Sequence, residues 1–359
     1  MKNFLYKALL FTNYLLVLML LLSYLSVKIS PDAFWPLAFL GLLYPYLVIL
    51  NFLCFAFWLY KGRWHFLYSL LVIAVGWTYL GRTFQLNFNN EKVAGSEPSR
   101  ILSYNVRYFD KFNWTNDEAA SSKMIEYIDN IDADIVCFQE FSNGKYKNVK
   151  SNKRLSPIVT DMEIHSQWLN SKANSGLVTL SRYPIKEKGV IHFDESTNFA
   201  IYTDIKVHSG ITRIYNLHLQ SISLDPNGYV LFDSLNLNDN SRSFKEAQDI
   251  FSRLKNAYQM RAGQAEIIAG HIRQSPYPVV ICGDFNDTPV SYTYQTIRGD
   301  FVDAFIESGS GISKTYNGKV PSFRIDYIMH SHGIHSFDYD LDKIEYSDHH
   351  PIYCSLYLN

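Results

Sequence analysis

The sequence of 359 residues has few cysteines and few charges. Its four cysteines include no C-x-x-C pair, which excludes a small disulfide-stabilised domain and a cysteine-rich zinc module. Charged residues make up 19% of the chain and the formal net charge is −1, which excludes a globally basic nucleic-acid-binding protein. Apolar residues, in contrast, are abundant, and a hydrophobic fraction of 47% excludes an intrinsically disordered chain.

The few charges divide the chain into two parts. Residues 1–98 carry seven basic and three acidic side chains, a net charge of +4. Residues 99–359 carry the other 26 basic and 31 acidic side chains, a net charge of −5. In the first part, the charged residues separate three uncharged blocks, at 8–27, 33–60 and 64–81.

Each block is long enough to cross a bilayer, which takes about 20 apolar residues in a helix. The alternative is a cleaved signal peptide followed by a hydrophobic hairpin, but the first block lacks a small-x-small cleavage site. Hydropathy therefore predicts a membrane anchor over residues 1–82 with three transmembrane helices, at about 8–27, 33–60 and 64–81. A polar linker is expected over residues 83–99.

The short loops predict how the anchor is oriented. Basic residues gather on the cytoplasmic side of membrane proteins. Two precede the first block and two fill the second loop (Lys2, Lys7, Lys61 and Arg63), whereas the first loop carries one basic and one acidic residue. We therefore expect an integral protein of the cell membrane with a cytoplasmic N-terminus. Three spans would place the remainder of the chain on the extracytoplasmic side.

The second part has the pattern of one α/β domain over residues 100–359. Helical periodicity occurs around 121–130 and, more strongly, between about 243 and 273. Between and around these segments are short runs rich in β-branched and aromatic residues, which predict strands at 101–107, 134–140, 176–181, 213–219, 279–285 and 324–329. Interleaved strands and helices over this length are typical of a single α/β domain.

Polar side chains stand at or near the ends of several predicted strands. Burying such groups after an apolar run is costly unless they are paired or bind a ligand, so we expect them to converge on one pocket. Asn216 and His218 lie two residues apart on one face of their strand, which makes Asn216 a candidate for substrate contact. The other candidates are Asn105, Glu140, Asp284, Asn286, Asp326, Asp348 and His349.

The types of these residues restrict the reactions that the site could catalyse. Carboxylate and amide oxygens without a cysteine cluster favour a hard cation, Mg²⁺ or Mn²⁺. Two histidines add donors for a phosphoryl group and a group that transfers protons near neutral pH. Together they indicate metal-assisted attack of water on a phosphate ester. The chain has no G-x-S-x-G motif, which argues against acyl transfer.

The ordered motifs YNVR, QE, SRYPI, NLHL, GDFND, RIDYI and SDHHP resemble those of the endonuclease/exonuclease/phosphatase superfamily. Its members include AP endonucleases, pancreatic-type deoxyribonucleases, inositol polyphosphate phosphatases and neutral sphingomyelinases. The resemblance covers residues 100–359 and implies a four-layer α-β-β-α sandwich of two packed sheets. It also implies Glu140 as the principal metal-binding carboxylate, Asn105 as a residue that places the metal, and Asp348 at a metal or second-metal position.

For catalysis, the resemblance implies that Asp284 aligns or deprotonates the attacking water and that Asn286 binds a phosphate oxygen. His218 would contact the phosphoryl group. His349 resembles the catalytic histidine, as a base or as a stabiliser of charge, and Asp326 the carboxylate that orients it.

Three functions remain open at this stage. A nuclease-like phosphoesterase fits the breadth of the superfamily and the aromatic residues after the first motif (Tyr108, Phe109, Phe112 and Trp114), which either stack on substrate or belong to the core. A phospholipid or sphingolipid phosphodiesterase or phosphatase fits the membrane anchor. A non-catalytic membrane scaffold would have no use for convergent carboxylates. The expected partners are therefore a nucleic acid or lipid-headgroup phosphate ester and the lipid bilayer.

Overall fold

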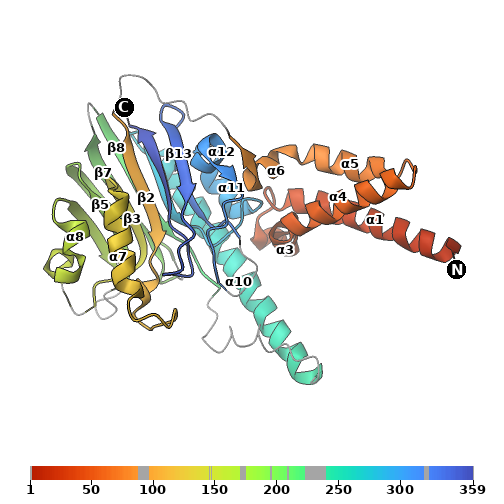
Figure 1. The fold of residues 1–359 in the computed structure, drawn as a ribbon, viewed down its shortest axis with the longest axis horizontal. Coiled ribbons are helices and arrows are strands. Elements are labelled where there is room, and N and C mark those ends of the chain that lie inside the picture. Colours follow the sequence, from red (N-terminus) through yellow and green to blue (C-terminus); the bar gives the residue numbers. More distant parts are fainter. Residues whose placement is uncertain are drawn as a thin grey trace.

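Runs of β-branched and aromatic residues form two six-stranded sheets, and the segments with helical periodicity lie outside them (Figure 1). The computed structural model describes residues 2–87, 97–144, 146, 148–169, 175–194, 196–207, 210–222, 240–318 and 323–358.

The first sheet has the strand order β13-β14-β2-β3-β5-β4. β2 and β3 are parallel, and the other neighbouring strands are antiparallel. The strands are β2 (Ser99–Asn105), β3 (Ile135–Ser142), β4 (Glu163–Trp168), β5 (Ser175–Ser181), β13 (His335–Leu341) and β14 (Ile352–Tyr357).

The second sheet has the order β10-β12-β9-β8-β7-β6. Here β8 and β9 form the parallel pair, and the remaining neighbours are antiparallel. The strands are β6 (Ile185–His192), β7 (Phe199–Val207), β8 (Gly210–His218), β9 (Val279–Asp284), β10 (Val302–Asp303) and β12 (Asp326–His330). Both sheets are therefore mixed, and the predicted strands are present. The sequence pattern did not predict the edge strands β4, β6, β10 and β13 or the interior strands β7 and β14.

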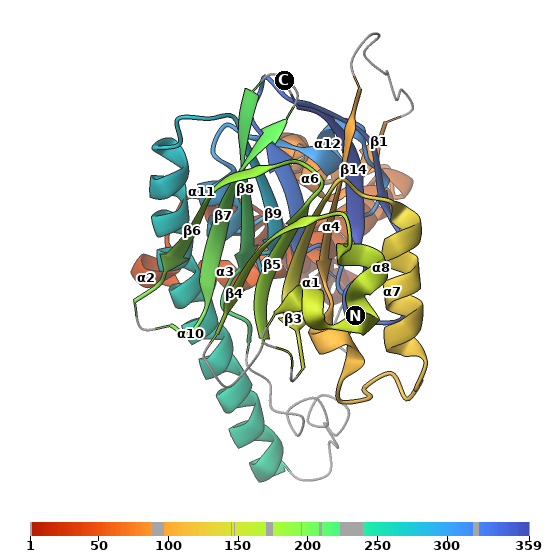
Figure 2. The same cartoon turned by 90° about the vertical axis from the view of Figure 1, so that its left-hand side faces the viewer.

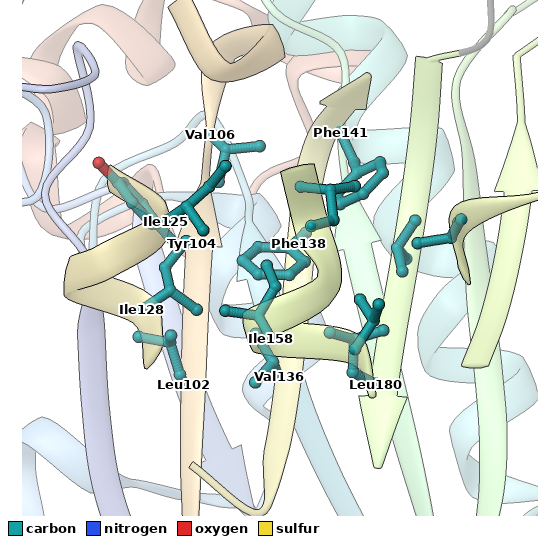
Figure 3. Packing of buried hydrophobic residues seen from close by; sticks show 14 of the residues in the cluster. Leu102, Tyr104, Val106, Ile125, Ile128, Val136, Phe138, Phe141, Ile158 and Leu180 are labelled. Carbon is teal, nitrogen blue, oxygen red and sulfur yellow. The ribbon is translucent and has the colours of Figure 1, made fainter. Parts of the chain in front are cut away.

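The sheets and helices form four layers, as the resemblance implied (Figure 2). Ile101, Cys137, Ile214 and Cys282 belong to the core between the sheets. Helix α7 (Ala120–Ile131) and α8 (Ser156–Val159) cover the first sheet, where Ile125 and other residues of α7 pack on Phe138 (Figure 3). The second sheet is covered by α10 (Asn240–Arg273) and α11 (Tyr292–Arg298).

The N-terminal part departs from three straight spans. Helix α1 (Lys2–Leu25) is, over Phe4–Leu25, long and apolar enough to cross a membrane. The other two predicted spans are each broken into a pair of helices, bent by 65° and by 69°. The pairs are α3 (Pro36–Leu42) with α4 (Tyr44–Tyr60) and α5 (Phe66–Val75) with α6 (Trp77–Thr83), and the short helix α2 (Pro31–Phe34) precedes them.

The two bends have local causes. Pro45 lies in the first turn of α4, where its ring and missing N–H are incompatible with continuation from α3. Gly76 ends α5, and a Cβ at this position would lie 2.1 Å from the hydroxyl of Tyr24, so α1 approaches the bend closely. One to three spans therefore fit the length and composition of the described helices.

The segment 83–99, predicted as a linker, begins with residues bound to the second part of the chain. β1 (Gln85–Leu86) pairs with β11 (Ser310–Gly311), and the Asn87 amide donates to the carbonyl oxygens of Ile306 and Gly309. Residues 88–96 of the segment lie outside the described residues. The helices α1–α6 thus sit against the α/β domain at the point where the chain leaves α6 (Figure 1).

Candidate active site

Topology brings the polar strand ends to one edge of the sandwich. Asn105 ends β2, His218 ends β8 and Asp284 ends β9. His218 is paired with Asp284 in the parallel ladder, and Asp326, the first residue of β12, is paired with Asp284 in the antiparallel one. Since β9 joins both ladders, its last residue lies in the middle of the candidate site.

Glu140 reaches this edge because β3 is irregular. The register between β3 and β5 shifts between Phe138 and Phe141, and Glu140 has a φ of 48°. A bulge of this kind inserts a residue into a strand and redirects its side chain. The carboxylate of Glu140 then lies 3.4 Å from the side-chain nitrogen of Asn105.

Asn105 bridges two carboxylates. Its side-chain nitrogen donates to Asp284 Oδ2 at 3.0 Å and approaches Glu140 Oε1 at 3.4 Å. Burial raises the pKa of both carboxyl groups, although charged His218 and His349 would lower them. Asp348 raises the pKa of Glu140 further, and Asp326 that of Asp284. The cluster therefore concentrates negative charge that would be stabilised by a cation.

His349 and Asp326 form a hydrogen-bonded pair. His349 Nδ1 lies 2.9 Å from Asp326 Oδ2, and its Nε2 lies 3.6 Å from Asp284 Oδ2. Burial opposes a charge on His349, but Asp326 and Asp284 outweigh it and raise the pKa of this histidine well above its usual value. The imidazole is thus oriented by one carboxylate and directed toward another.

His218 faces the carboxylates, and its Nε2 makes no hydrogen bond to any residue that the structure describes. Its Nε2 is buried and lies 3.6 Å from Glu140 Oε1 and 3.8 Å from Asp284 Oδ2. A buried ring nitrogen without a partner is costly, so the position suits a group that acts on a ligand.

The GDFN turn sets the conformation of Asp284 and Asn286. A Cβ at Gly283 would lie 2.1 Å from the Leu217 carbonyl oxygen, and the φ of 147° also requires glycine. The backbone N–H of Asn286 donates to Asp284 Oδ1 at 2.8 Å, and its side-chain amide donates to the Leu219 carbonyl oxygen. The turn itself therefore holds the Asp284 carboxylate, and the Leu219 carbonyl oxygen holds the Asn286 side chain.

Asp348 is engaged by a residue that the sequence analysis did not single out. Arg107 Nε lies 3.3 Å from Asp348 Oδ2, and its guanidinium stacks over the Trp114 ring at 4.0 Å. Trp114 and Phe112 are exposed next to this pair, whereas Phe109 is buried against Phe138 and Phe141. The aromatic segment thus divides between core and surface. The signal for Arg107 was its position in the YNVR motif, two residues after Asn105.

Asn216 is not brought to the surface of the site, which corrects its expected contact with substrate. It is 0% exposed between the sheets. Its amide donates to the carbonyl oxygens of Phe138 and Val178, and its oxygen accepts from Gln139. Although Asn216 and His218 share a face of β8, only the end of the strand reaches the edge where the sheets part. Asn216 therefore links the sheets.

The donor set fits a hard divalent cation. Among the described residues, Asp284, Asp326 and His349 offer ligand atoms within 4.8 Å of one another. Asp326 is paired with His349, however, which leaves the carboxylates of Glu140 and Asp284 as the charged oxygen donors. Asn105 directs its side-chain nitrogen toward both of them, and its oxygen accepts from the Arg107 backbone N–H at 3.1 Å. Oxygen donors with uncompensated negative charge are what Mg²⁺ and Mn²⁺ require.

Solved structures share this fold. An endonuclease/exonuclease/phosphatase from Bacteroides vulgatus is 17% identical, with a TM-score of 0.55 over 73% of this chain and 100% of that chain. Humanized D. rerio TDP2 is 15% identical, with a TM-score of 0.52 over 72% and 98%. ANGEL2, a 2′,3′-cyclic phosphatase, is 14% identical, with a TM-score of 0.52 over 76% and 99%. At these identities the likeness shows the fold.

Sequence comparisons assign the two parts separately. No curated protein matches the chain. Residues 6–83 match a family described as a domain of unknown function (DUF8431). Residues 102–349, more than half of the chain, match the Endonuclease/Exonuclease/phosphatase family. The chain therefore belongs to the endonuclease/exonuclease/phosphatase family.

Proposed function

We propose that this chain is a membrane-anchored phosphoesterase that depends on a divalent cation and hydrolyses phosphodiester or phosphomonoester bonds, in the first place those of nucleic acids. The observation that carries the proposal is the juxtaposition of Asn105, Glu140 and Asp284 with the paired His349 and Asp326. Family membership supports a reaction on phosphate esters.

Glu140 and Asn105 are the residues that we assign to Mg²⁺ or Mn²⁺, with Asp284 beside them. Asp348, the remaining candidate metal ligand, is paired with Arg107. A bound divalent cation polarises a phosphoryl oxygen and lowers the pKa of water.

The protein's own groups would act on water and phosphate. His349, whose raised pKa favours the imidazolium, would donate from Nε2 to a phosphoryl oxygen and stabilise developing charge. Asp284 would accept a hydrogen bond or a proton from the attacking water. Asn286 and His218 would bind the remaining phosphoryl oxygens, and Asp326 would keep the imidazole of His349 in place.

The first test is cation-dependent hydrolysis by the full chain purified in detergent. We expect turnover of bis(4-nitrophenyl) phosphate or a natural phosphate ester with Mg²⁺ or Mn²⁺, and a loss of at least about 10²-fold after chelation by EDTA, because the cation supplies several kcal/mol of charge stabilisation. Restoring excess Mg²⁺ should restore the rate. Turnover that is indifferent to EDTA would refute the cation assignment, and no turnover of any phosphate ester would favour a non-catalytic scaffold.

The second candidate function is hydrolysis of lipid phosphate esters at the membrane surface. The observation that favours it is the direct packing of the N-terminal helices on the α/β domain, with Phe39 of α3 stacked on Phe251 of α10 at 4.3 Å between ring centroids. Such packing holds the site at a constant distance from a bilayer. A panel of DNA, RNA, phospholipid, sphingolipid and inositol phosphate substrates separates the two candidates by their relative kcat/KM.

We propose that the catalytic domain is extracytoplasmic. The chain after α6 lies on the same side of the membrane whether α1 alone spans it or α1 and both bent pairs each span it, because one and three are both odd numbers. In each case residues after Thr83 lie on the side of the membrane opposite Lys2 and Lys7, the basic residues at the start of α1. A reporter fused after residue 359 is expected to be active only outside the cytoplasm. A fusion that is active only in the cytoplasm would reverse this orientation.

A further inference from the structure

The loop that follows the GDFN turn inserts into the end of the N-terminal helices. Val290 is 1% exposed and belongs to the same apolar cluster as Leu20, Tyr44 and Val72. The Ser26 hydroxyl donates to the Val290 carbonyl oxygen at 2.9 Å. Gly41 of α3 permits this approach, because a Cβ there would lie 2.3 Å from the same oxygen. The helices and the loop are therefore in direct backbone contact.

The loop connects this contact rigidly to the candidate site. Five residues separate Asp284 from Val290, and four of them are buried. Phe285 N–H donates to the Ile325 carbonyl oxygen at 2.8 Å, and the Tyr327 hydroxyl donates to the Asp287 carbonyl oxygen at 2.8 Å. Because close-packed interiors transmit displacement, a shift of Val290 would also displace Asp284.

A second connection leads to Asp326. Arg82, near the end of α6, donates to the Pro289 carbonyl oxygen at 3.3 Å and to Gln295 Oε1 at 2.7 Å. Its own carbonyl oxygen accepts from Arg324 at 2.9 Å. Arg324 is also held by both carboxylate oxygens of Asp303, and it precedes Asp326 by two residues. Buried ion pairs of this geometry are costly to disturb.

We propose that the N-terminal helices α1–α6 are a positioning element of the active site, which hold Asp284, Asn286 and Asp326 in their catalytic geometry through Val290 and Arg82. The proposal rests on the phosphoesterase function proposed above. It makes the membrane segment a part of the catalytic unit in addition to an anchor. A contact that served attachment alone would contribute to stability and leave kcat of the folded protein unchanged.

The test is Gly41→Ala in the full chain, because the added Cβ collides with a backbone atom that cannot rotate away. We expect kcat to fall by about 10- to 10²-fold, since a displacement of about 1 Å at catalytic groups has this effect. KM should change less than kcat, because of the three residues held by the helices only Asn286 is assigned to binding the phosphoryl group. Gly81→Ala is the matched control: its Cβ would meet only the Gln85 amide, at 3.6 Å, and kcat should stay at the wild-type value.

Two further measurements keep the proposal falsifiable. Val290→Ala leaves a small cavity in place of a clash and should lower kcat in the same direction if Gly41→Ala fails to fold. Hydrogen–deuterium exchange reports on the loop without any substrate, and Gly41→Ala should accelerate exchange in residues 284–291. Wild-type kcat in both variants, or unchanged exchange, would overturn the positioning role. A wild-type protein that is inactive on every phosphate ester would instead refute the proposed function, and the exchange measurement would still decide the inference.

Discussion

Asp284→Asn is expected to lower kcat of the full chain by at least about 10³-fold, because the substitution removes both a general base and the negative charge beside the cation. The shape of the side chain is kept, and its oxygen can still accept the hydrogen bond that Asn105 donates at 3.0 Å. Burial and the neighbouring Asp326 raise the pKa of Asp284, so the carboxylate is held at the site against its own electrostatic preference.

The same argument predicts the sign of the stability change. Without divalent cations, Asp284→Asn should leave the unfolding temperature unchanged or raise it, since a buried and repelled charge is removed. The exposed Asp129, on the outer helix α7, supplies the control: Asp129→Asn should alter neither kcat nor the unfolding temperature. If Asp284→Asn kept more than about a tenth of the wild-type kcat, or lowered the unfolding temperature as a lost structural hydrogen bond does, Asp284 would be structural.

Asp326→Asn is expected to lower kcat by about 10²- to 10⁴-fold, the usual range for positioned acid–base groups. Its effect passes through His349, whose Nδ1 it holds at 2.9 Å and whose pKa it raises. An amide at position 326 would no longer favour the imidazolium, and it could present an N–H in place of the acceptor.

A double-mutant cycle separates this role from a general loss of structure. Because Asp326 acts through His349, the double variant Asp326→Asn/His349→Ala should be no slower than His349→Ala alone. If instead the fold-losses in kcat of the two single variants multiplied in the double variant, Asp326 and His349 would contribute to kcat independently. Thermal unfolding of all three variants controls for misfolding, because Asp326 is the first residue of β12 and is paired with Asp284 in the sheet.

Much of the architecture of the α/β domain could be predicted from local pattern. Continuous apolar runs such as 279–282 can be buried only between layers, and the periodic segment from about 243 to 273 can bury its apolar side only as a helix. The structure has β9 and α10 at these places. The edge strand β13 was not recognised, although Phe337, Tyr339 and Leu341 alternate with polar residues in it; its pairing with β14 identifies it as a strand.

The candidate site could be predicted in composition but not in arrangement. Glu140 was expected as a strand-terminal residue, yet it lies within β3 and reaches the pocket through a bulge. Asn216 was placed with His218 because they share a face, although the second sheet covers Asn216 completely. Arg107 was not singled out, since its partner Asp348 follows it by more than 200 residues.

Sequence alone thus determined the residue types at the strand ends, the glycine of the GDFN turn and the apolar character of the N-terminal blocks, all of which depend on a residue and its near neighbours. Tertiary structure decided which of the polar residues meet, where the N-terminal helices bend, and that Val290 lies among those helices. Each of these depends on contacts between segments far apart in the chain. The uneven distribution of charge divided the chain into two parts, and only the fold placed the N-terminal helices against the loop that follows Asp284.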